Sequence, residues 1–395
     1  MEPFLLLAGE CSYLLPMNQS ARAETVPALV TDGRGAHALQ AIEVGPPGPG
    51  EVAVNLRASG VCHTDFDSLT WGHPHVLGHE GAGVVAGVGA GVSAVVTGDR
   101  VLLNWAIPCG GCGACTRGHR NLCELNNEVT ARSGSETAGA AHGASTRLDG
   151  VPLRRSFHLG TMAARTVVKE AAVVKIPEAS SISWAAASIV GCGVMTGFGS
   201  AVHAGEVRRG DRCVVLGCGG VGLSAVQGCR IAGASRVVAV DLFETRLEMA
   251  RSLGATDVIR ASRDDAGLAA VAAKVRELFD GSGADVAVEC TAVPALGVAP
   301  LAMIRNGGIA VQASGIEEEI VMDMRLFEWD KTYRNPLYGG CDPAIDLPRL
   351  LELHDAEALK LEELVSRSYR LDQLDDAFAA MRSGEIAKGV ILFDA

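Results

Sequence analysis

The sequence is short of positive charge and has no long apolar run. Its 34 Lys and Arg residues are outnumbered by 46 Asp and Glu residues, and the net charge of −12 argues against nucleic acid as a partner. No basic amphipathic helix points to a membrane surface, and no apolar stretch reaches the ~18 residues that a spanning helix needs. Charged residues are only 20% of the chain and hydrophobic residues 48%, so its 395 residues predict a folded protein of about two domains.

The N-terminal segment, MEPFLLLAGECSYLLP, lacks the features of a signal peptide. It has no basic region, and Gly9 and Glu10 interrupt its short apolar run. We expect residues 1–26 to be a disordered extension, with Met17 as an alternative start. The 12 cysteines show no disulfide-framework spacing outside the motifs below, which favours a reducing, cytoplasmic location.

The most informative motif is the run CGGCGACTRGHRNLC, which contains Cys109, Cys112, Cys115 and Cys123. This spacing lets one short loop surround a tetrahedral ion, and four thiolates would close the coordination of a structural zinc. The alternative is a redox or disulfide cluster. The glycines between the cysteines favour zinc, because they free the backbone to curl around a metal.

A second metal site is suggested by residues on either side of that loop. GVCHTD contains Cys62, GHEGAG contains His79 and Glu80, and GCGVMTG contains Cys192. Two cysteines and a histidine could share one zinc and leave a fourth position open, which is the pattern of a catalytic zinc. Taken singly, such a histidine is more often a turn or core residue, and such a cysteine a small buried hydrophobe.

A nucleotide-binding motif follows a predicted strand at residues 212–217. The run GCGGVG contains Gly217, Gly219, Gly220, Val221 and Gly222, and a predicted helix follows at 223–234. The glycines permit a tight turn, close approach of a pyrophosphate and close helix packing. The next predicted strand ends at Asp241, about 20 residues further on, where a carboxylate binds the ribose hydroxyls of NAD and repels the 2′-phosphate of NADP. The alternative is a structural glycine turn.

Three regions differ in their patterns. Residues 27–193 are rich in glycine and short β-like runs, which predicts an irregular barrel. From 194 to 337 strands alternate with helices, which predicts a doubly wound parallel sheet. The tail from 338 has helical periodicity and ends in an apolar strand. Further strands are expected at 236–241, 257–259, 284–290, 309–314 and 389–393, and further helices at 244–255, 269–279, 346–353, 361–365 and 372–384.

With these motifs in this order, the chain resembles the zinc-dependent medium-chain alcohol dehydrogenases from about residue 27 onward. LNWAIPCGGC and GCGVMTG resemble most the bacterial aryl-alcohol dehydrogenases and the thiol-dependent formaldehyde dehydrogenases, such as the mycothiol-linked enzyme. The resemblance implies a Rossmann nucleotide domain at 194–337 and a discontinuous, GroES-like β-barrel catalytic domain at 27–193 and 338–395. It also implies two zinc ions per chain, NAD, and a homodimer or homotetramer formed by pairing of nucleotide-domain sheet edges.

The resemblance assigns the catalytic zinc to Cys62, His79 and Cys192. Glu80 is implied to sit behind the zinc or to exchange onto it during ligand turnover. Asp65 is implied to orient a ligand histidine through its free ring nitrogen. An N-cap or turn aspartate is the alternative for Asp65.

Other positions are implied to bind the alcohol or the cofactor. Thr64 would hydrogen-bond the alcohol and start a proton relay. Asp67 stands where many members have the histidine that ends the relay; it could equally be a solvated turn residue. His63 would lie against the pyrophosphate and Arg246 near the adenosine ribose, unless Arg246 only solvates a helix face. Lys388 occupies a position near the catalytic glutamate or the cofactor phosphates.

The substrate pocket is implied by Trp105, His158, Gly315 and Leu337. His158 falls where many members have phenylalanine, and Gly315 where they have a larger side chain, so we expect a bulky aryl or natural-product alcohol. Plain packing is the alternative for Trp105 and His158.

Two other functions remain open. A thiol-adduct formaldehyde dehydrogenase would need basic residues at the pocket mouth, which Arg154 and Arg155 could supply. The other alternative is a non-catalytic nucleotide-binding protein, which would not need three zinc ligands with a fourth coordination position left open.

Overall fold

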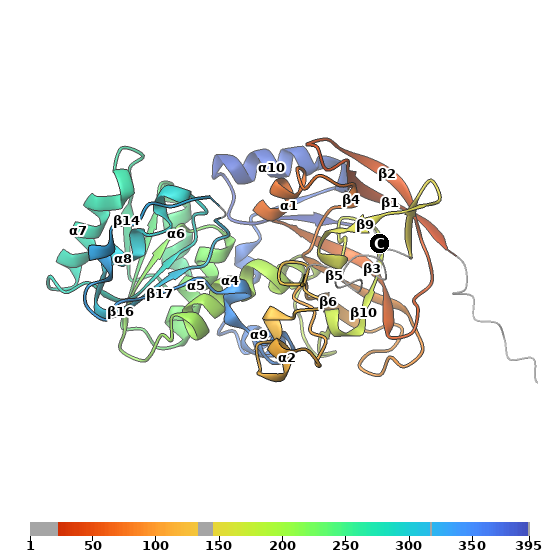
Figure 1. The fold of residues 1–395 in the computed structure, drawn as a ribbon, viewed down its shortest axis with the longest axis horizontal. Coiled ribbons are helices and arrows are strands. Elements are labelled where there is room, and N and C mark those ends of the chain that lie inside the picture. The colour runs from red at the N-terminus through yellow and green to blue at the C-terminus, as the bar shows by residue number, and fades with distance from the viewer. Residues whose placement is uncertain (1–22, 133–144, 317, 394–395) are drawn as a thin grey trace, which may run out of the picture.

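The computed structural model describes residues 23–132, 145–316 and 318–393, so most of the expected N-terminal extension lies outside the described residues. Strand β1 begins at Glu24, which corrects the expectation that the extension reaches residue 26. The described chain forms two lobes, with the C-terminal segment returning to the lobe that contains β1 (Figure 1).

The first lobe is built from two sheets of short strands. One has the order β8-β7-β2-β1-β4-β9; the other has the order β11-β6-β5-β3-β19-β18, with β10 also paired to β3. Because β19 is antiparallel to β3, the end of the chain completes this lobe. The strands are β1 (Glu24–Thr31), β2 (His37–Val44), β3 (Glu51–Val61), β4 (His75–Val76), β5 (Gly81–Val88), β6 (Arg100–Leu103), β7 (Thr146–Leu148), β8 (Val151–Pro152), β9 (Arg154–Arg155), β10 (Arg165–Lys169), β11 (Val173–Lys175), β18 (Arg367–Tyr369) and β19 (Gly389–Leu392).

The second lobe is a parallel sheet with the order β14-β13-β12-β15-β16-β17, the doubly wound order of dinucleotide-binding folds. Alternate residues face opposite sides: Val215 belongs to the core that contains α5 and α6, and Val214 to the core that contains α7 and α8. The elements are β12 (Arg212–Leu216), α5 (Gly220–Ile231), β13 (Arg236–Asp241), α6 (Glu244–Ser252), β14 (Asp257–Arg260), α7 (Ala269–Leu278), β15 (Ala284–Glu289), α8 (Ala299–Met303), β16 (Ile304–Gln312) and β17 (Thr332–Arg334).

A long apolar helix connects the lobes. It comprises α3 (Trp184–Ile189), a π-helical turn (Val190–Val194), α4 (Met195–Gly199) and a second π-helical turn (Ser200–Ala204). It has 21 residues, and its most apolar 18-residue window has a mean hydropathy of 1.5, which corrects the expectation that no stretch is long enough to span a membrane. Because 78% of its most apolar window is buried inside the protein, core packing explains its composition.

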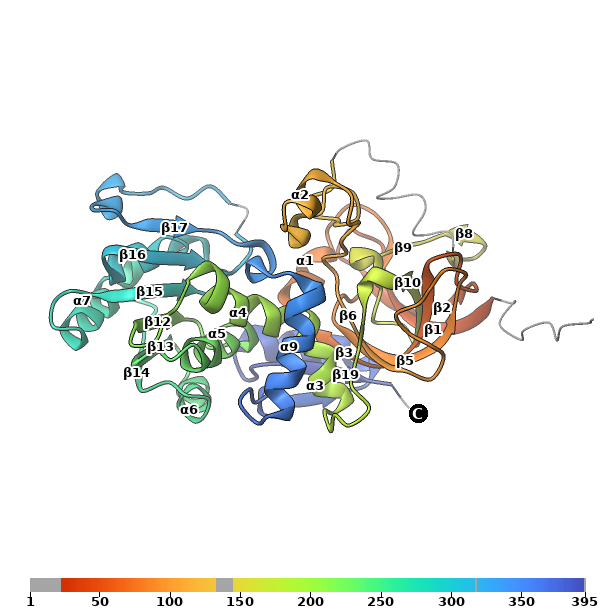
Figure 2. The ribbon, with the colours of Figure 1, turned by 90° about the horizontal axis from the view of Figure 1, so that it is seen from below.

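The remaining helices are α1 (His63–Ser68), α2 (Gly113–Thr116), α9 (Pro343–Asp355) and α10 (Leu374–Ser383). Figure 2 shows α4 and α9 between the two lobes. The predicted fold class, a Rossmann sheet plus a GroES-like barrel, is confirmed. Helix 361–365 is replaced by a single 3-10 turn, Glu362–Leu364. The domain boundaries stay predictions. The predicted boundary between residues 193 and 194 falls inside the connecting helix.

Candidate functional site

The structure brings Cys62, His79, Glu80 and Cys192 together. Their ligand atoms all lie within 4.8 Å of one another, although they come from the end of β3, the loop between β4 and β5, and the first π-helical turn. His79 is 1% exposed and Glu80 is fully buried. A hydrogen bond with Cys192 lowers the pKa of Cys62 well below its usual value, despite burial. Two thiol sulfurs and an imidazole converging in this way fit a zinc ion.

Asp65 connects two of these residues. Its Oδ1 lies 2.8 Å from His79 Nδ1, and its Oδ2 accepts a hydrogen bond from the Cys62 backbone N–H at 2.9 Å. The first contact leaves Nε2 as the ring atom of His79 that can face a metal. Asp65 therefore contacts the histidine as the resemblance implies, and it also bonds the backbone of Cys62, which is the N-cap residue of α1 in place of Asp65 itself.

Glu80 is paired with Lys388 inside the protein. Lys388 Nζ lies 2.7 Å from Glu80 Oε1, which also accepts the Gly193 N–H at 3.3 Å. Burial opposes the charge on Lys388, but Glu80, Cys62 and Cys192 raise its pKa above the usual value. Glu80 Oε2 has no hydrogen-bond partner among the described residues. A side chain at Gly60 would collide with this carboxylate, so the backbone holds Glu80 close to the cluster.

The four-cysteine loop forms a second cluster, with all ligand atoms within 4.8 Å. Cys109 and Cys115 have their sulfurs 4.0 Å apart, close to the roughly 3.8 Å that tetrahedral Zn–S bonds imply. Backbone N–H groups donate to the sulfurs of Cys109, Cys112 and Cys123 at 3.2–3.5 Å. Although burial opposes it, these bonds lower the pKa of Cys112 to about 6. Burial instead raises the pKa of Cys115 to about 12, so these hydrogen bonds favour a thiolate at Cys112, and a bound zinc would have to favour it at Cys115.

The glycine-rich turn between β12 and α5 is open where a phosphate would approach. A Cβ on Gly219 would meet nothing within 4 Å, whereas one on Gly222 would collide with the Gly217 carbonyl. Gly217 has φ 85°, a conformation that favours glycine. Each glycine is thus needed for the reason that the motif predicts, and the turn fits a dinucleotide.

The glycine-rich turn lies directly beside the metal-ligand cluster. A Cβ on Gly193, the residue after Cys192, would lie 3.7 Å from Glu80 Oε1 and 3.9 Å from Val221 Cγ2. The Gly220 N–H also donates to the Ala387 carbonyl at 3.2 Å. The two predicted sites therefore form one continuous site between the lobes.

Comparison with known proteins agrees with this geometry. Residues 48–178 match the alcohol dehydrogenase GroES-like domain, and residues 220–353 match the zinc-binding dehydrogenase model. An NDMA-dependent alcohol dehydrogenase of Amycolatopsis methanolica is 36% identical over 369 residues, which cover 90% of this chain and 95% of that protein. The chain belongs to the zinc-dependent medium-chain alcohol dehydrogenase family.

Solved structures of the family share the whole arrangement. An alcohol dehydrogenase zinc-binding domain protein from Burkholderia ambifaria is 31% identical, with a TM-score of 0.83. Benzyl alcohol dehydrogenase from Acinetobacter calcoaceticus is 29% identical, also with a TM-score of 0.83. Each alignment covers 94% of this chain and 100% of the other.

Of the two residues that the resemblance assigns to a proton relay, Thr64 lies beside a predicted zinc ligand, and Asp67 lies at the surface. The Thr64 hydroxyl lies 3.8 Å from Cys62 Sγ, so it is next to the metal-ligand cluster. Asp67 lies three residues further along α1 and is exposed to solvent. Its part in a relay stays a prediction.

At the predicted adenosine end of the cofactor site, Asp241 and Arg246 already make hydrogen bonds to the protein backbone. Asp241 accepts the backbone N–H groups of Cys218 at 2.7 Å and Phe243 at 3.0 Å. Arg246 lies 3.9 Å from Asp241 and donates to the Ile386 carbonyl at 2.9 Å. Arg246 therefore joins the two lobes rather than only solvating a helix. His63 is exposed at the start of α1, and its role stays a prediction.

An aromatic cluster surrounds the ligand histidine in a chain that is only 4% aromatic. The Phe157 ring lies 4.9 Å from the His79 ring, 5.1 Å from Trp105 and 5.6 Å from Trp71. Trp105 also lies 4.6 Å from Tyr338. Phe157 and Trp71 were not predicted from the sequence, because neither belongs to a motif that marks it as part of the site.

The pocket position given to His158 stays a prediction, and its neighbour Phe157 has its ring 4.9 Å from the His79 ring. His158 is 7% exposed, and burial, reinforced by Arg155, lowers its pKa to about 4. Phe157 and His158 both have positive φ, 49° and 61°, so the two residues form a tight left-handed turn. Gly315 is exposed with open space around it, and Leu337 is half-buried beside Tyr338.

Arg154 and Arg155, the two basic residues proposed to bind a thiol cofactor, differ in their exposure to solvent. Arg155 is 5% exposed and donates to the Thr166 hydroxyl and the Val167 carbonyl, so it supports β10. Arg154 is exposed. The structure thus removes one of the two cations on which the thiol-adduct alternative depended.

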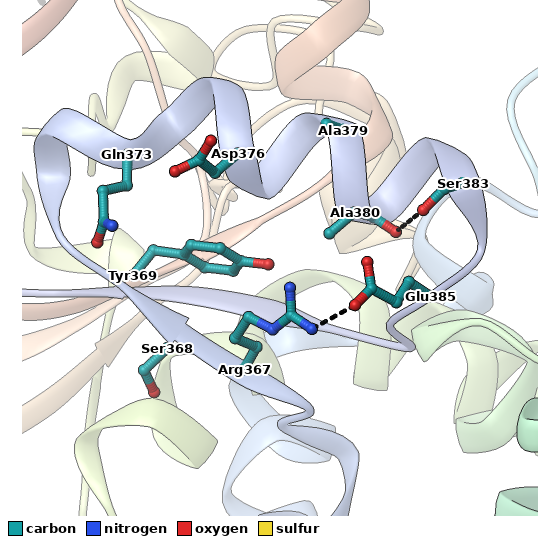
Figure 3. A pocket seen from close by; sticks show the side chains of 9 residues that line it. All are labelled: Arg367, Ser368, Tyr369, Gln373, Asp376, Ala379, Ala380, Ser383 and Glu385. Atoms are coloured by element: carbon teal, nitrogen blue, oxygen red, sulfur yellow. Dashed lines mark hydrogen bonds and ion pairs between the residues drawn. The ribbon is translucent and has the colours of Figure 1, made fainter.

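A cavity of about 520 Å³ lies apart from these residues, between α10 and β18 (Figure 3). Its charged groups are largely paired, with Arg367 Nη2 2.6 Å from Glu385 Oε1. None of its lining residues belongs to either cysteine cluster or to the glycine-rich turn.

Proposed function

We propose that the protein is a zinc- and NAD-dependent dehydrogenase that oxidises an alcohol, with one zinc at Cys62, His79 and Cys192 and a second in the four-cysteine loop. The observation that carries this proposal is the contact between the ligand cluster and the glycine-rich turn beside Gly193. Family membership supports both cofactors.

The chemistry is divided between the cofactors and this chain. Zinc would act as a Lewis acid on the substrate oxygen, and NAD would accept the hydride. Asp65 fixes the direction of His79, and Lys388 holds the Glu80 carboxylate beside the cluster. Thr64 stands next to Cys62, where its hydroxyl could accept a hydrogen bond from an alcohol and pass its own proton on to a further acceptor.

We propose an aryl alcohol as the substrate class. The rings of Trp71, Phe157, Trp105 and Tyr338 contact one another in series, and the Phe157 ring also lies against His79. An aryl substrate could extend this series, because aromatic pairs are worth about 0.5–1.5 kcal/mol beyond their buried area. Trp105 Nε1 is buried without a hydrogen-bond partner among the described residues, so it could donate to a polar substituent. Likeness to benzyl alcohol dehydrogenase supports the same class.

The test is a substrate panel followed by NADH absorbance. Benzylic alcohols should exceed ethanol in kcat/KM by at least about tenfold. Parallel assays with a low-molecular-weight thiol plus formaldehyde test the thiol-adduct alternative. An assay with NDMA as the electron acceptor tests whether the protein shares the NDMA dependence for which its relative is named. No turnover by protein that holds both zinc and NADH would favour the non-catalytic alternative.

Asp241 is expected to determine the choice of NAD over NADP. Asp241→Ser should lower kcat/KM for NAD by about 10- to 100-fold, because hydrogen bonds to charged groups are worth about 1.5–3 kcal/mol. Loss of the carboxylate should also improve use of NADP, since the 2′-phosphate is no longer repelled. Steady-state kinetics with both cofactors measures the ratio. An unchanged ratio would remove Asp241 from cofactor recognition.

We propose that two copies pair along the outer edge of β17. This strand ends the sheet order, and three large apolar residues on the segment before it are exposed: Val321 at 91%, Met324 at 72% and Trp329 at 67%. Such an edge and patch are typical of an interface. Trp329→Asp should shift the mass measured by light scattering from dimer to monomer, whereas Val151→Asp, at an exposed site on the other lobe, should not. A monomeric parent protein would contradict the proposal.

A further inference from the structure

Tyr338 lies in a tight turn between β17 and α9 and reaches the backbone next to Cys192. Its φ is 56°, and the following Gly339 and Gly340 also have positive φ, 69° and 75°. Left-handed backbone is unfavourable for a large residue, so contacts of its side chain must hold it there. The side chain is 2% exposed, and its hydroxyl donates to the Gly191 carbonyl at 2.6 Å.

Gly191 is fixed from the opposite side by β6. A side chain at Gly191 would collide with the Leu103 carbonyl, so the backbone can approach β6 this closely only at a glycine. Gly191 belongs to the π-helical turn Val190–Val194, where an inserted residue disturbs the regular helical hydrogen bonds. The Tyr338 hydroxyl is thus an external donor that fixes the peptide immediately before Cys192.

The same turn is attached to the four-cysteine loop. Asn121, which lies between Cys115 and Cys123, is 5% exposed, and its Nδ2 donates to the Leu337 carbonyl at 2.8 Å. The neighbouring Arg120 lies 3.0 Å from Asp342, the N-cap residue of α9. The loop therefore contacts both ends of the turn that carries Tyr338.

We propose that Tyr338 and Asn121 are positioning residues through which the four-cysteine loop holds Cys192 in place as a metal ligand. The inference rests on the proposed function, in which Cys192 binds the catalytic zinc. Groups that orient a ligand from outside the metal's own ligand set affect metal affinity because a misplaced sulfur binds less well.

The test is Tyr338→Phe, which keeps the ring against Trp105 and removes only the hydroxyl. Chelator titration should remove the catalytic-site metal at a concentration about tenfold lower than in the parent protein. The visible absorption of the cobalt-substituted protein should shift, since those bands report ligand geometry. The variant should lose kcat with little change in KM. Asn121→Ala should change the same readouts in the same direction, and it decides the question if Tyr338→Phe does not fold.

Tyr369→Phe is the matched control, because Tyr369 is also buried, at 6% exposed, but lies in β18 away from both clusters. It should match the parent protein in metal retention and in the cobalt spectrum. Parent-like values for Tyr338→Phe and Asn121→Ala would overturn the inference. Cys192→Ala distinguishes failure of the proposed function from failure of the positioning role. If Cys192→Ala retains both metals, the proposed function fails. If it loses one metal while Tyr338→Phe loses none, only the positioning role fails.

Discussion

Cys192→Ala is expected to lose one metal ion per chain and to reduce kcat/KM for the alcohol by at least about 1,000-fold. Because Lys388 engages the Glu80 carboxylate, the variant leaves only Cys62 and His79 as a thiolate and an imidazole, which are too few to hold zinc with one position open. Without the Lewis acid, nothing else among the described residues of the cluster can stabilise a developing alkoxide: Lys388, the nearest cation, is already paired with Glu80. Metal analysis and NADH formation measure the two losses.

Cys229→Ala provides the control for this variant. Cys229 is also buried, but it lies in α5 and belongs to neither ligand cluster. Its replacement should leave the metal content and the turnover close to those of the parent protein. Retention of both metals by Cys192→Ala would contradict the assignment of the catalytic zinc.

The sequence was sufficient for those parts of the site that depend on local spacing. The four cysteines fall within one short loop, and the glycines fall within one turn, so neighbouring residues alone determine their geometry. Strands β12, β13 and β15 were likewise predictable, because each is a short valine-rich run buried on both faces. The resemblance added the distant ligands Cys62, His79 and Cys192.

The parts that could not be predicted depend on tertiary contacts or on one strained turn. Glu80 and Lys388 are 308 residues apart, and although the resemblance placed Lys388 near the glutamate, residue spacing alone could not show that β19 pairs with β3 and brings the two together. Phe157 and His158 are neighbours in sequence, and their consecutive positive φ values decide which ring meets His79. No residue pattern predicts a phenylalanine with a left-handed backbone, so the contact of Phe157 with His79 could not be predicted.

The helix Trp184–Ala204 is a further element whose position and backbone form could not be predicted from the sequence. Its composition would suit a membrane, yet it is the core element on which both lobes pack. Its two π-helical turns have no sequence signature, although the first carries Cys192. Sequence spacing can therefore identify a ligand without showing how its backbone is held.

Cys123→Ala is expected to destabilise the protein more than any substitution in the catalytic cluster. Cys123 is fully buried, and its sulfur accepts the Asn126 N–H at 3.3 Å. Structural zinc sites contribute about 10–16 kcal/mol to the folding of small zinc domains, so loss of even a third of this should lower Tm by about 5–10 °C. Calorimetry with metal analysis should show a lower Tm and the loss of one zinc per chain.

Cys213→Ala, at a fully buried cysteine in β12, distinguishes loss of the metal from loss of a buried sulfur, and it should lower Tm much less. The same experiment separates zinc from the redox or disulfide alternative. A chelator should lower Tm of the parent protein toward that of Cys123→Ala, whereas a reductant should leave it unchanged. If the reductant lowered Tm and the chelator did not, the four sulfurs would be a disulfide cluster. Because Asn121 ties the same loop to the turn of Tyr338, activity should fall before the lobe itself unfolds.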